Sequence, residues 1–210
     1  MTRVHVKICG VRSRADALAC IELGASAIGV NFVASSTRRL DEGLAREIAR
    51  AVHASGTKAI VVGVVADMDL EAMRALVRDV ELDCLQLHGD ETHEMLAALL
   101  PHAYKAARIA TAEDVARARA YPGEHILVDA KVAGVLGGSG VAFDWSLVKE
   151  LATERRLTLA GGLDPDNVER AVREVRPYCV DVASGVERAG SPGEKDLARV
   201  SAFIEAARRA

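Results

Sequence analysis

Two hydrophobic patterns alternate along the chain. Short apolar runs rich in Val, Ile and Ala end in Gly, Asp, Asn or Ser, and longer stretches follow in which apolar residues recur three and four positions apart. The first pattern predicts buried strands and the second predicts amphipathic helices. We expect strands at Val4–Ile8, Ala27–Asn31, Ala59–Val65, Cys84–Leu87, Tyr104–Ala107, Ile126–Asp129, Thr158–Ala160 and Val180–Val182. Helices are expected to begin near Ser13, Asp41, Asp69, Glu91, Thr111, Asp144, Asp164 and Gly193.

About eight strand–helix units predict an α/β protein, a single (β/α)8 TIM barrel that forms one catalytic domain over residues 1–210. Two helix starts carry capping signals. Ser13 with Asp16 resembles a capping box, and Asp164 with Pro165 places an acceptor and a proline where a helix begins. An open doubly wound sheet is the competing fold. It usually has fewer units, and the glycine pattern at 138–143 lacks the third glycine of a dinucleotide-binding turn.

The composition is that of a soluble globular protein. Half of the residues are hydrophobic, 27% are charged, and the formal net charge is -3. No basic tract suggests a nucleic-acid partner. The first residues lack the features of a secretory signal, and no run approaches the ~20 apolar residues of a membrane span, so we expect a cytoplasmic protein without membrane contact. The four scattered cysteines predict reduced thiols and no metal site; they are Cys9, Cys20, Cys84 and Cys179.

Two reactive side chains fall at predicted strand ends, where the active sites of such barrels lie. Alternation places Lys7 and Cys9 on one strand face, toward the barrel mouth, and the lysine charge favours a thiolate. Asp129 follows three large aliphatic residues, where burial favours the protonated carboxyl of a general acid. Each residue has a structural alternative: Cys9 as a small core residue, and Asp129 as a helix cap or a partner of Lys131.

Glycine-rich loops follow the last three predicted strands. Glycines let backbone N–H groups approach an anion closely, and barrels frequently bind phosphate at these loops. Single glycine pairs are ordinarily turns, but three neighbouring loops carry them here. The sequence therefore predicts a phosphate site formed by Gly138, Gly140, Gly161, Gly162, Ser184 and Gly185.

An ordered set of segments carries a resemblance to a known family. The segments are Lys7-Ile8-Cys9-Gly10, Gly29 to Phe32 with Ser36 to Arg38, Leu85 to Glu91, Val128-Asp129-Ala130, Gly137 to Gly140 with Phe143-Asp144-Trp145, Leu159 to Leu163 with Pro165 and Asn167, and Asp181 to Glu187. Taken together over nearly the whole chain, they resemble the phosphoribosylanthranilate isomerases of tryptophan biosynthesis.

The resemblance implies an enzyme, a barrel that needs no cofactor and works as a monomer or homodimer on a small phosphorylated substrate. The family converts N-(phosphoribosyl)anthranilate to the carboxyphenylamino-deoxyribulose phosphate by an Amadori rearrangement, which interconverts an aldose and a ketose. Carried over by motif, Asp129 is the general acid that protonates the ribose ring oxygen as the ring opens to an iminium. Cys9 is the general base that removes the neighbouring C2 proton, after which the enolamine tautomerises to the ketone.

The resemblance also predicts substrate-binding residues. Arg38 matches the family arginine that meets the anthranilate carboxylate, with an exposed loop charge as its alternative. Asp181 is expected at the ribose hydroxyls, or else as a structural hydrogen-bond acceptor. Lys7 and His88 complete the predicted set, although His88 could instead tie its strand to the following loop.

Three residues depart from the family pattern. Thr37 stands where the family often has Pro, Arg39 where an aromatic residue is common, and Val141 where Lys commonly follows the glycine-rich loop.

Three rival functions remain open. One rival is another phosphorylated-sugar isomerase or epimerase, which has no need of Arg38 for an aromatic acid. A second is a catalytically silent paralogue that binds a phosphorylated metabolite. A third is dual specificity toward the histidine-pathway aminoaldose, which usually pairs two aspartates, whereas strand one here ends in Cys9.

Overall fold

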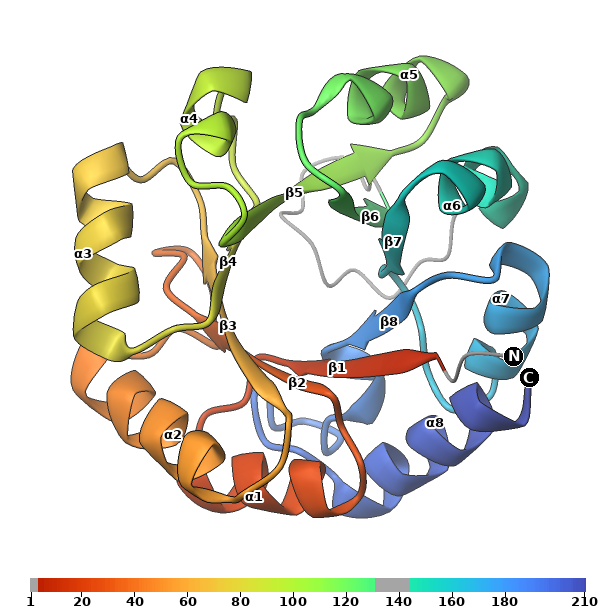
Figure 1. Ribbon diagram of the computed structural model, residues 1–210. Coiled ribbons are helices and arrows are strands. Elements are labelled where there is room, and N and C mark those ends of the chain that lie inside the picture. The colour runs from red at the N-terminus through yellow and green to blue at the C-terminus, as the bar shows by residue number, and fades with distance from the viewer. Residues whose placement is uncertain (1–3, 131–143) are drawn as a thin grey trace.

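Parallel strands close into a barrel at the centre of the molecule (Figure 1). The structure is a computed structural model that describes residues 4–130 and 144–210 of the chain. In those residues the strands pair in sequence order, and β8 pairs with β1 to close the ring. The strands are β1 His5–Cys9, β2 Ala27–Asn31, β3 Ile60–Val65, β4 Cys84–Leu87, β5 Ala103–Ile109, β6 His125–Ala130, β7 Arg156–Leu159 and β8 Cys179–Val182.

Helices surround the barrel (Figure 1). They are α1 Arg14–Glu22, α2 Glu42–Ala54, α3 Leu70–Val80, α4 His93–Ala97, α5 Ala112–Ala120, α6 Lys149–Glu154, α7 Val168–Val175 and α8 Leu197–Arg209, with short 3-10 helices η1 Trp145–Val148 and η2 Ser184–Val186. Strand and helix alternate throughout the described residues, so the predicted (β/α)8 barrel is confirmed.

Strand alternation sorts the side chains into two packing layers. Large aliphatic residues such as Ile8, Ile28 and Leu85 face the helices and are fully buried. The barrel interior is filled differently, by small residues around one aromatic ring: Ala27, Val62, Tyr104, Ala106, Leu127 and Ala160. Because the interior side chains are mostly short, room remains inside the ring for the polar residues that reach the site.

The boundaries of several elements differ from the predicted ones. β2 and β4 have their predicted bounds, and the other strands differ by one or two residues at an end. α8 begins at Leu197 instead of near Gly193, because Gly193 has a left-handed φ of 89° and Asp196 accepts hydrogen bonds from the first helical N–H groups. α7 begins at Val168, because the carboxylate of Asp164 caps a turn ahead of the helix.

The predicted cap at the start of α1 is present. The Ser13 hydroxyl accepts a hydrogen bond from the backbone N–H of Asp16 at 3.0 Å. α4 begins at His93, two residues after the predicted Glu91, with Thr92 as its N-cap. Glu91 is not part of the helix, because its buried side chain accepts a hydrogen bond from the backbone N–H of Gly89 in the preceding loop.

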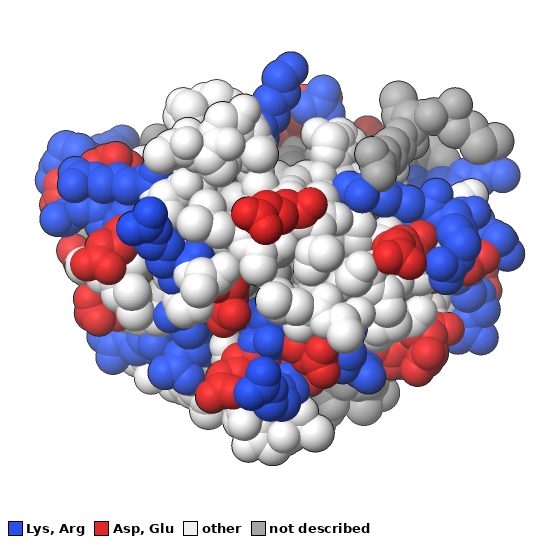
Figure 2. All heavy atoms as spheres, turned by 90° about the horizontal axis from the view of Figure 1, so that it is seen from below, with Lys and Arg blue, Asp and Glu red and all other residues white. Residues whose placement is uncertain are grey.

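The surface carries both signs of charge. On the part of the face in Figure 2 that the structure describes, Lys and Arg side chains are interspersed with Asp and Glu, and neither sign forms a continuous patch. None of the helices in the described ranges is long and apolar enough to cross a membrane.

Candidate active site

A cavity of about 420 Å³ opens at the carboxyl ends of the strands. The described residues of its wall include predicted site residues from five different strands or their loops: Cys9, Arg38, His88, Asp129 and Asp181. Parallel strands in a closed barrel end at the same rim, so residues far apart in sequence converge there. The structure therefore brings the predicted thiol and carboxyl group into one cavity.

Cys9 ends β1 with its side chain inside the barrel. It can lie there because its neighbour across the strand pair is Gly29, where a Cβ atom would come within 2.8 Å of the Cys9 sulfur. Burial raises the pKa of the Cys9 thiol above its ordinary value, and the charges of Lys7 and Lys195 offset this only in part. The Lys7 charge favours the thiolate, as expected from the sequence, but removal from water has the larger effect and the net shift of the Cys9 pKa is upward.

Lys7 is not among the described residues that line the cavity. Its ammonium nitrogen donates to Gln86 Oε1 at 2.8 Å and to Asp181 Oδ2 at 3.0 Å, and all three residues are buried. Burial opposes the charge, but Asp181 raises the pKa of Lys7 well above its ordinary value. Lys7 is therefore a buried cation that holds two strand-end side chains in place.

Asp181 lines the cavity and has one carboxylate oxygen without a donor in the described residues. Its Oδ2 accepts from Lys7, whereas Oδ1 is buried and makes no hydrogen bond to the part of the chain that the structure describes. A buried carboxylate oxygen without a donor is costly, so a ligand hydroxyl at this position would satisfy it.

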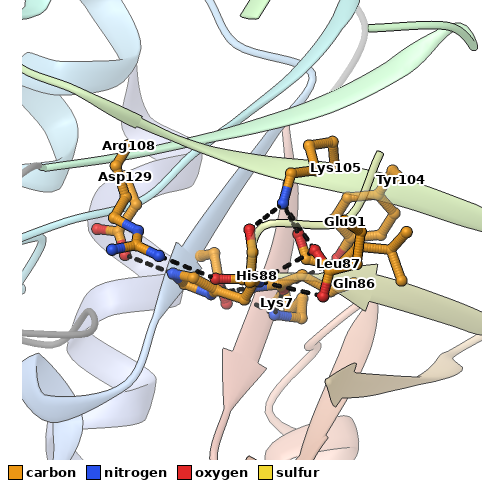
Figure 3. A network of polar contacts seen from close by, with 11 residues as sticks. Lys7, Gln86, Leu87, His88, Glu91, Tyr104, Lys105, Arg108 and Asp129 are labelled. Carbon is orange, nitrogen blue, oxygen red and sulfur yellow. Dashed lines mark hydrogen bonds and ion pairs between the residues drawn. The ribbon is translucent and has the colours of Figure 1, made fainter. Parts of the chain in front are cut away.

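His88 and Asp129 both line the cavity, and their side chains point toward each other (Figure 3). His88 Nε2 lies 3.6 Å from Asp129 Oδ2, and His88 Nδ1 lies 3.1 Å from the side-chain nitrogen of Gln86. Burial, with the charges of Arg108, Lys105 and Lys7, lowers the pKa of His88 to about 4. Its imidazole is therefore neutral near pH 7.

The backbone of His88 is bonded to the two strands beside β4, whereas the structural role predicted for it was a bond to its own loop. Its N–H donates to Val65 O at 2.8 Å, and Arg108 Nη2 donates to its carbonyl at 3.4 Å. The residue ties β4 to its neighbours while its ring lines the cavity.

Arg38 lies at the cavity with its guanidinium already oriented. Nε donates to Glu187 Oε1 at 2.6 Å and Nη2 donates to Glu187 Oε2 at 2.7 Å. Lys195 also donates to Glu187 Oε1, at 3.1 Å. Burial alone would raise the pKa of Glu187, but its hydrogen bonds and charge contacts with Arg38 and Lys195 lower it below its ordinary value. An ionised Glu187 thus fixes the arginine at the rim.

A buried ion pair outside the barrel holds the loop after β4 (Figure 3). Lys105 Nζ lies 2.7 Å from Glu91 Oε2 and also donates to the carbonyl of Leu87 at 3.2 Å. Glu91 accepts from the backbone N–H groups of Gly89 and of Asp67, which lies after β3. The pair therefore joins three strands around the backbone that flanks His88.

Comparison with known proteins identifies the family. A sequence model described as "N-(5'phosphoribosyl)anthranilate (PRA) isomerase" matches residues 6–206, which is nearly the whole chain. The chain belongs to this family. The resemblance inferred from the motifs is thereby confirmed.

Individual PRA isomerases are similar to this chain over almost their full length. N-(5'-phosphoribosyl)anthranilate isomerase of Pseudomonas aeruginosa (strain LESB58) is 47% identical over 210 residues, covering 99% of this chain and 97% of the relative. That of Myxococcus xanthus is 45% identical and covers 98% of this chain and 96% of the relative. The crystal structure of the Thermotoga maritima enzyme superposes with a TM-score of 0.87 at 35% identity, covering 99% of this chain and all of that one. Another PRA isomerase structure holds reduced 1-(o-carboxyphenylamino)-1-deoxyribulose 5-phosphate, with a TM-score of 0.85 at 34% identity; it covers 99% of this chain and all of the other.

The predicted phosphate loops are present in part within the described residues. Gly161, Gly162 and Ser184 line the cavity. Gly185 is not among its described lining residues; a Cβ there would lie 2.0 Å from Leu163 O, so this glycine lets the loops after β7 and β8 pack together. The predicted phosphate-binding residues Gly138 and Gly140, and the departure at Val141, lie outside the described residues.

Sequence patterns alone leave three residues of the site without a role. Gln86, Glu187 and Lys195 were not assigned a role, although each bonds to a predicted site residue or its partner. A signal existed for Gln86: strand alternation places it on the same face as His88, inside the barrel. The partnership of Glu187 with Arg38 depends on loop geometry, which local sequence patterns do not encode.

Proposed function

We propose that this protein is a PRA isomerase that converts N-(5'-phosphoribosyl)anthranilate to 1-(o-carboxyphenylamino)-1-deoxyribulose 5-phosphate, with residues 1–210 acting as one catalytic unit. The main structural support is that the Cys9 and Asp129 side chains line the same cavity. The match to the family model over residues 6–206 supports the same reaction.

In the proposed reaction Asp129 acts first. Its protonated carboxyl donates a proton to the ribose ring oxygen as the C1–O bond breaks, which leaves an iminium at C1 and a carboxylate on Asp129. The cation acidifies the C2 proton, and the Cys9 thiolate removes it. The resulting enolamine tautomerises to the ketone. One proton is delivered to oxygen and one is taken from carbon, so the rearrangement needs no outside oxidant or reductant.

The raised pKa of Cys9 fits this role in the complex. Because its pKa is raised, the Cys9 thiol must first give its proton to solvent, and the positive charge of the iminium favours this loss; the thiolate so formed is a strong base. Gly29 is required in this arrangement because a larger residue would displace the sulfur.

The remaining wall residues recognise the two ends of the substrate in this proposal. Arg38 meets the anthranilate carboxylate through N–H groups that Glu187 does not use, since a guanidinium has five donors. Asp181 Oδ1 accepts from a ribose hydroxyl. Backbone groups at Gly161, Gly162 and Ser184 bind the phosphate.

The direct test is loss of anthranilate-type fluorescence when purified protein is added to freshly prepared N-(5'-phosphoribosyl)anthranilate. We expect a protein-dependent loss of fluorescence that saturates with substrate. A preparation that binds the substrate but leaves the fluorescence unchanged would contradict the proposal in favour of a silent binder. A dephosphorylated substrate should bind far more weakly, and equal affinity would contradict the phosphate site.

A further inference from the structure

The amide of Gln86 has only one chemically sensible orientation (Figure 3). Lys7 Nζ lies 2.8 Å from Gln86 Oε1, and the Tyr104 hydroxyl donates to the same oxygen at 3.2 Å. An ammonium group can only donate, so the atom that faces it must be the amide oxygen. The buried cation therefore turns the amide nitrogen of Gln86 toward the other side.

That nitrogen determines the tautomer of His88. Gln86 Nε2 lies 3.1 Å from His88 Nδ1. An amide nitrogen can only donate, so Nδ1 must accept and cannot carry a proton. The His88 pKa of about 4 leaves the ring with a single proton near pH 7. This proton must then be on Nε2.

His88 Nε2 points toward the candidate general acid. It lies 3.6 Å from Asp129 Oδ2, and both residues line the cavity. The ring has little freedom to turn away, because Gln86 bonds to its other nitrogen and backbone groups before and after His88 are held by Lys105. Catalytic hydrogen bonds are often long without substrate and shorten in the complex.

We propose that Gln86 is a positioning residue that holds His88 in the Nε2–H tautomer, so that His88 donates a hydrogen bond to Asp129 during the reaction. The catalytic consequence rests on the proposed function. An N–H aimed at Asp129 stabilises the carboxylate that forms once Asp129 has given up its proton. The opposite tautomer presents a lone pair to that carboxylate and disfavours proton transfer. Through two side chains, the Lys7 ammonium thus determines which atom of His88 faces Asp129.

The tautomer can be measured without any substrate. Nitrogen-15 NMR of histidine-labelled protein near pH 7 distinguishes a protonated ring nitrogen from an unprotonated one, and the signal missing from His88→Gln assigns His88 among the six histidines. We expect a protonated Nε2 and an unprotonated Nδ1. A proton on Nδ1, or on both nitrogens, would overturn the proposal whatever the protein's activity.

Two variants test the role of Gln86. Gln86→Glu replaces the donor to Nδ1 by an acceptor, so the neutral Nε2–H form should disappear and kcat should fall about tenfold or more, which is ~1.4 kcal/mol, with a smaller change in KM. The matched control is Tyr104→Phe, which removes a neighbouring hydrogen bond to the same Gln86 oxygen but leaves Lys7; it should keep the tautomer and kcat. A Gln86→Glu protein that retains the neutral Nε2–H form, or a Tyr104→Phe protein that loses it, refutes the assignment. If Gln86→Glu does not fold, the spectra of the wild-type protein and of Tyr104→Phe still show which nitrogen of His88 carries the proton. The fluorescence assay of wild-type protein tests the proposed function separately.

Discussion

Arg38 and Glu187 meet with two parallel hydrogen bonds, from Nε to Oε1 and from Nη2 to Oε2, although 149 positions separate them in sequence. The arginine follows β2 and the glutamate follows β8, so the pair crosses the rim over β1. A bidentate pair of this kind fixes the plane of the guanidinium as well as its position. The carboxylate recognition proposed for Arg38 would therefore depend on a residue near the other end of the chain.

Replacement of Arg38 should impair binding more than turnover. We expect Arg38→Ala to raise KM at least about tenfold with folding intact, because a hydrogen bond to a charged group contributes roughly 1.5–3 kcal/mol. The adjacent, exposed Arg39 offers a matched control. Steady-state kinetics of Arg39→Ala should give nearly the wild-type KM. An unchanged KM for Arg38→Ala would assign it a surface role.

Glu187→Gln should reproduce part of that defect without touching the ligand. The neutral amide cannot hold both Arg38 nitrogens and Lys195, so KM should rise, by about tenfold, and kcat should change less. Glu194→Gln serves as the control, since Glu194 is an exposed partner of Arg188. If the Glu187 variant has a normal KM and a normal melting temperature, the pair has no positioning role.

Cys9→Ala and Asp129→Asn should each remove most of the activity. General acid–base groups contribute about two to four orders of magnitude, so each variant should lose two orders or more in kcat while retaining its circular dichroism spectrum. Cys84→Ala removes a thiol from the same barrel interior outside the described cavity wall and should remain active. Near-normal turnover in either catalytic variant removes that residue from the mechanism.

The ionisation of Cys9 can be followed in the free enzyme. Because burial raises the pKa of this thiol above the ordinary value of 9.0, alkylation of Cys9 by iodoacetamide should still be accelerating at pH 9, where free cysteine is already levelling off. Mass spectrometry of the peptide containing Cys9 gives the rate at each pH. A plateau below pH 9 would show that the cations Lys7 and Lys195 outweigh burial.

His125 should make the protein less stable in mild acid. Burial, with the charges of Arg156, Lys7 and Arg155 and a smaller contribution from His5, lowers the pKa of His125 to about 4. The folded pKa is thus below the unfolded value of 6.5, so the unfolded chain binds more protons as the pH falls, and stability present above pH 6.5 is lost toward pH 4.

The loss from His125 amounts to about 3 kcal/mol over that window. Urea unfolding of His125→Gln should show a weaker dependence on pH between 6.5 and 4 than the wild-type protein. His102→Gln, at an exposed position, should keep the wild-type dependence. Equal slopes for His125→Gln and wild type would contradict the buried neutral histidine.

The sequence predicted the barrel well because its determinants are local. Strand alternation and helical spacing persist in each unit, and the loops are short, so the eight units could be counted without coordinates. The predicted start of α8 near Gly193 is too early, because the residues around Gly193 form a turn whose composition resembles that of a helix N-terminus. Such boundaries depend on backbone φ and on which carboxylate caps the first turn, as Asp196 does here.

The site was predictable where a residue ends a strand and harder to predict where one residue acts on another. Cys9 and Asp129 could be placed at the cavity because each lies at the end of a strand. The net shift of the Cys9 pKa could not be predicted, because it depends on the balance between burial and charge. Gln86 required knowledge of the strand register, which places it between Lys7 and His88.

The ion pair between Glu91 and Lys105 restricts how this family member can change over evolutionary time. Loss of either charge alone leaves the other buried without its partner, at a cost of about 3–5 kcal/mol, comparable to much of a protein's total stability. A single-step substitution at either position is therefore expected to be eliminated by selection. The two positions should covary as a coupled pair, whereas the exposed side chains of α4 beside them are free to drift.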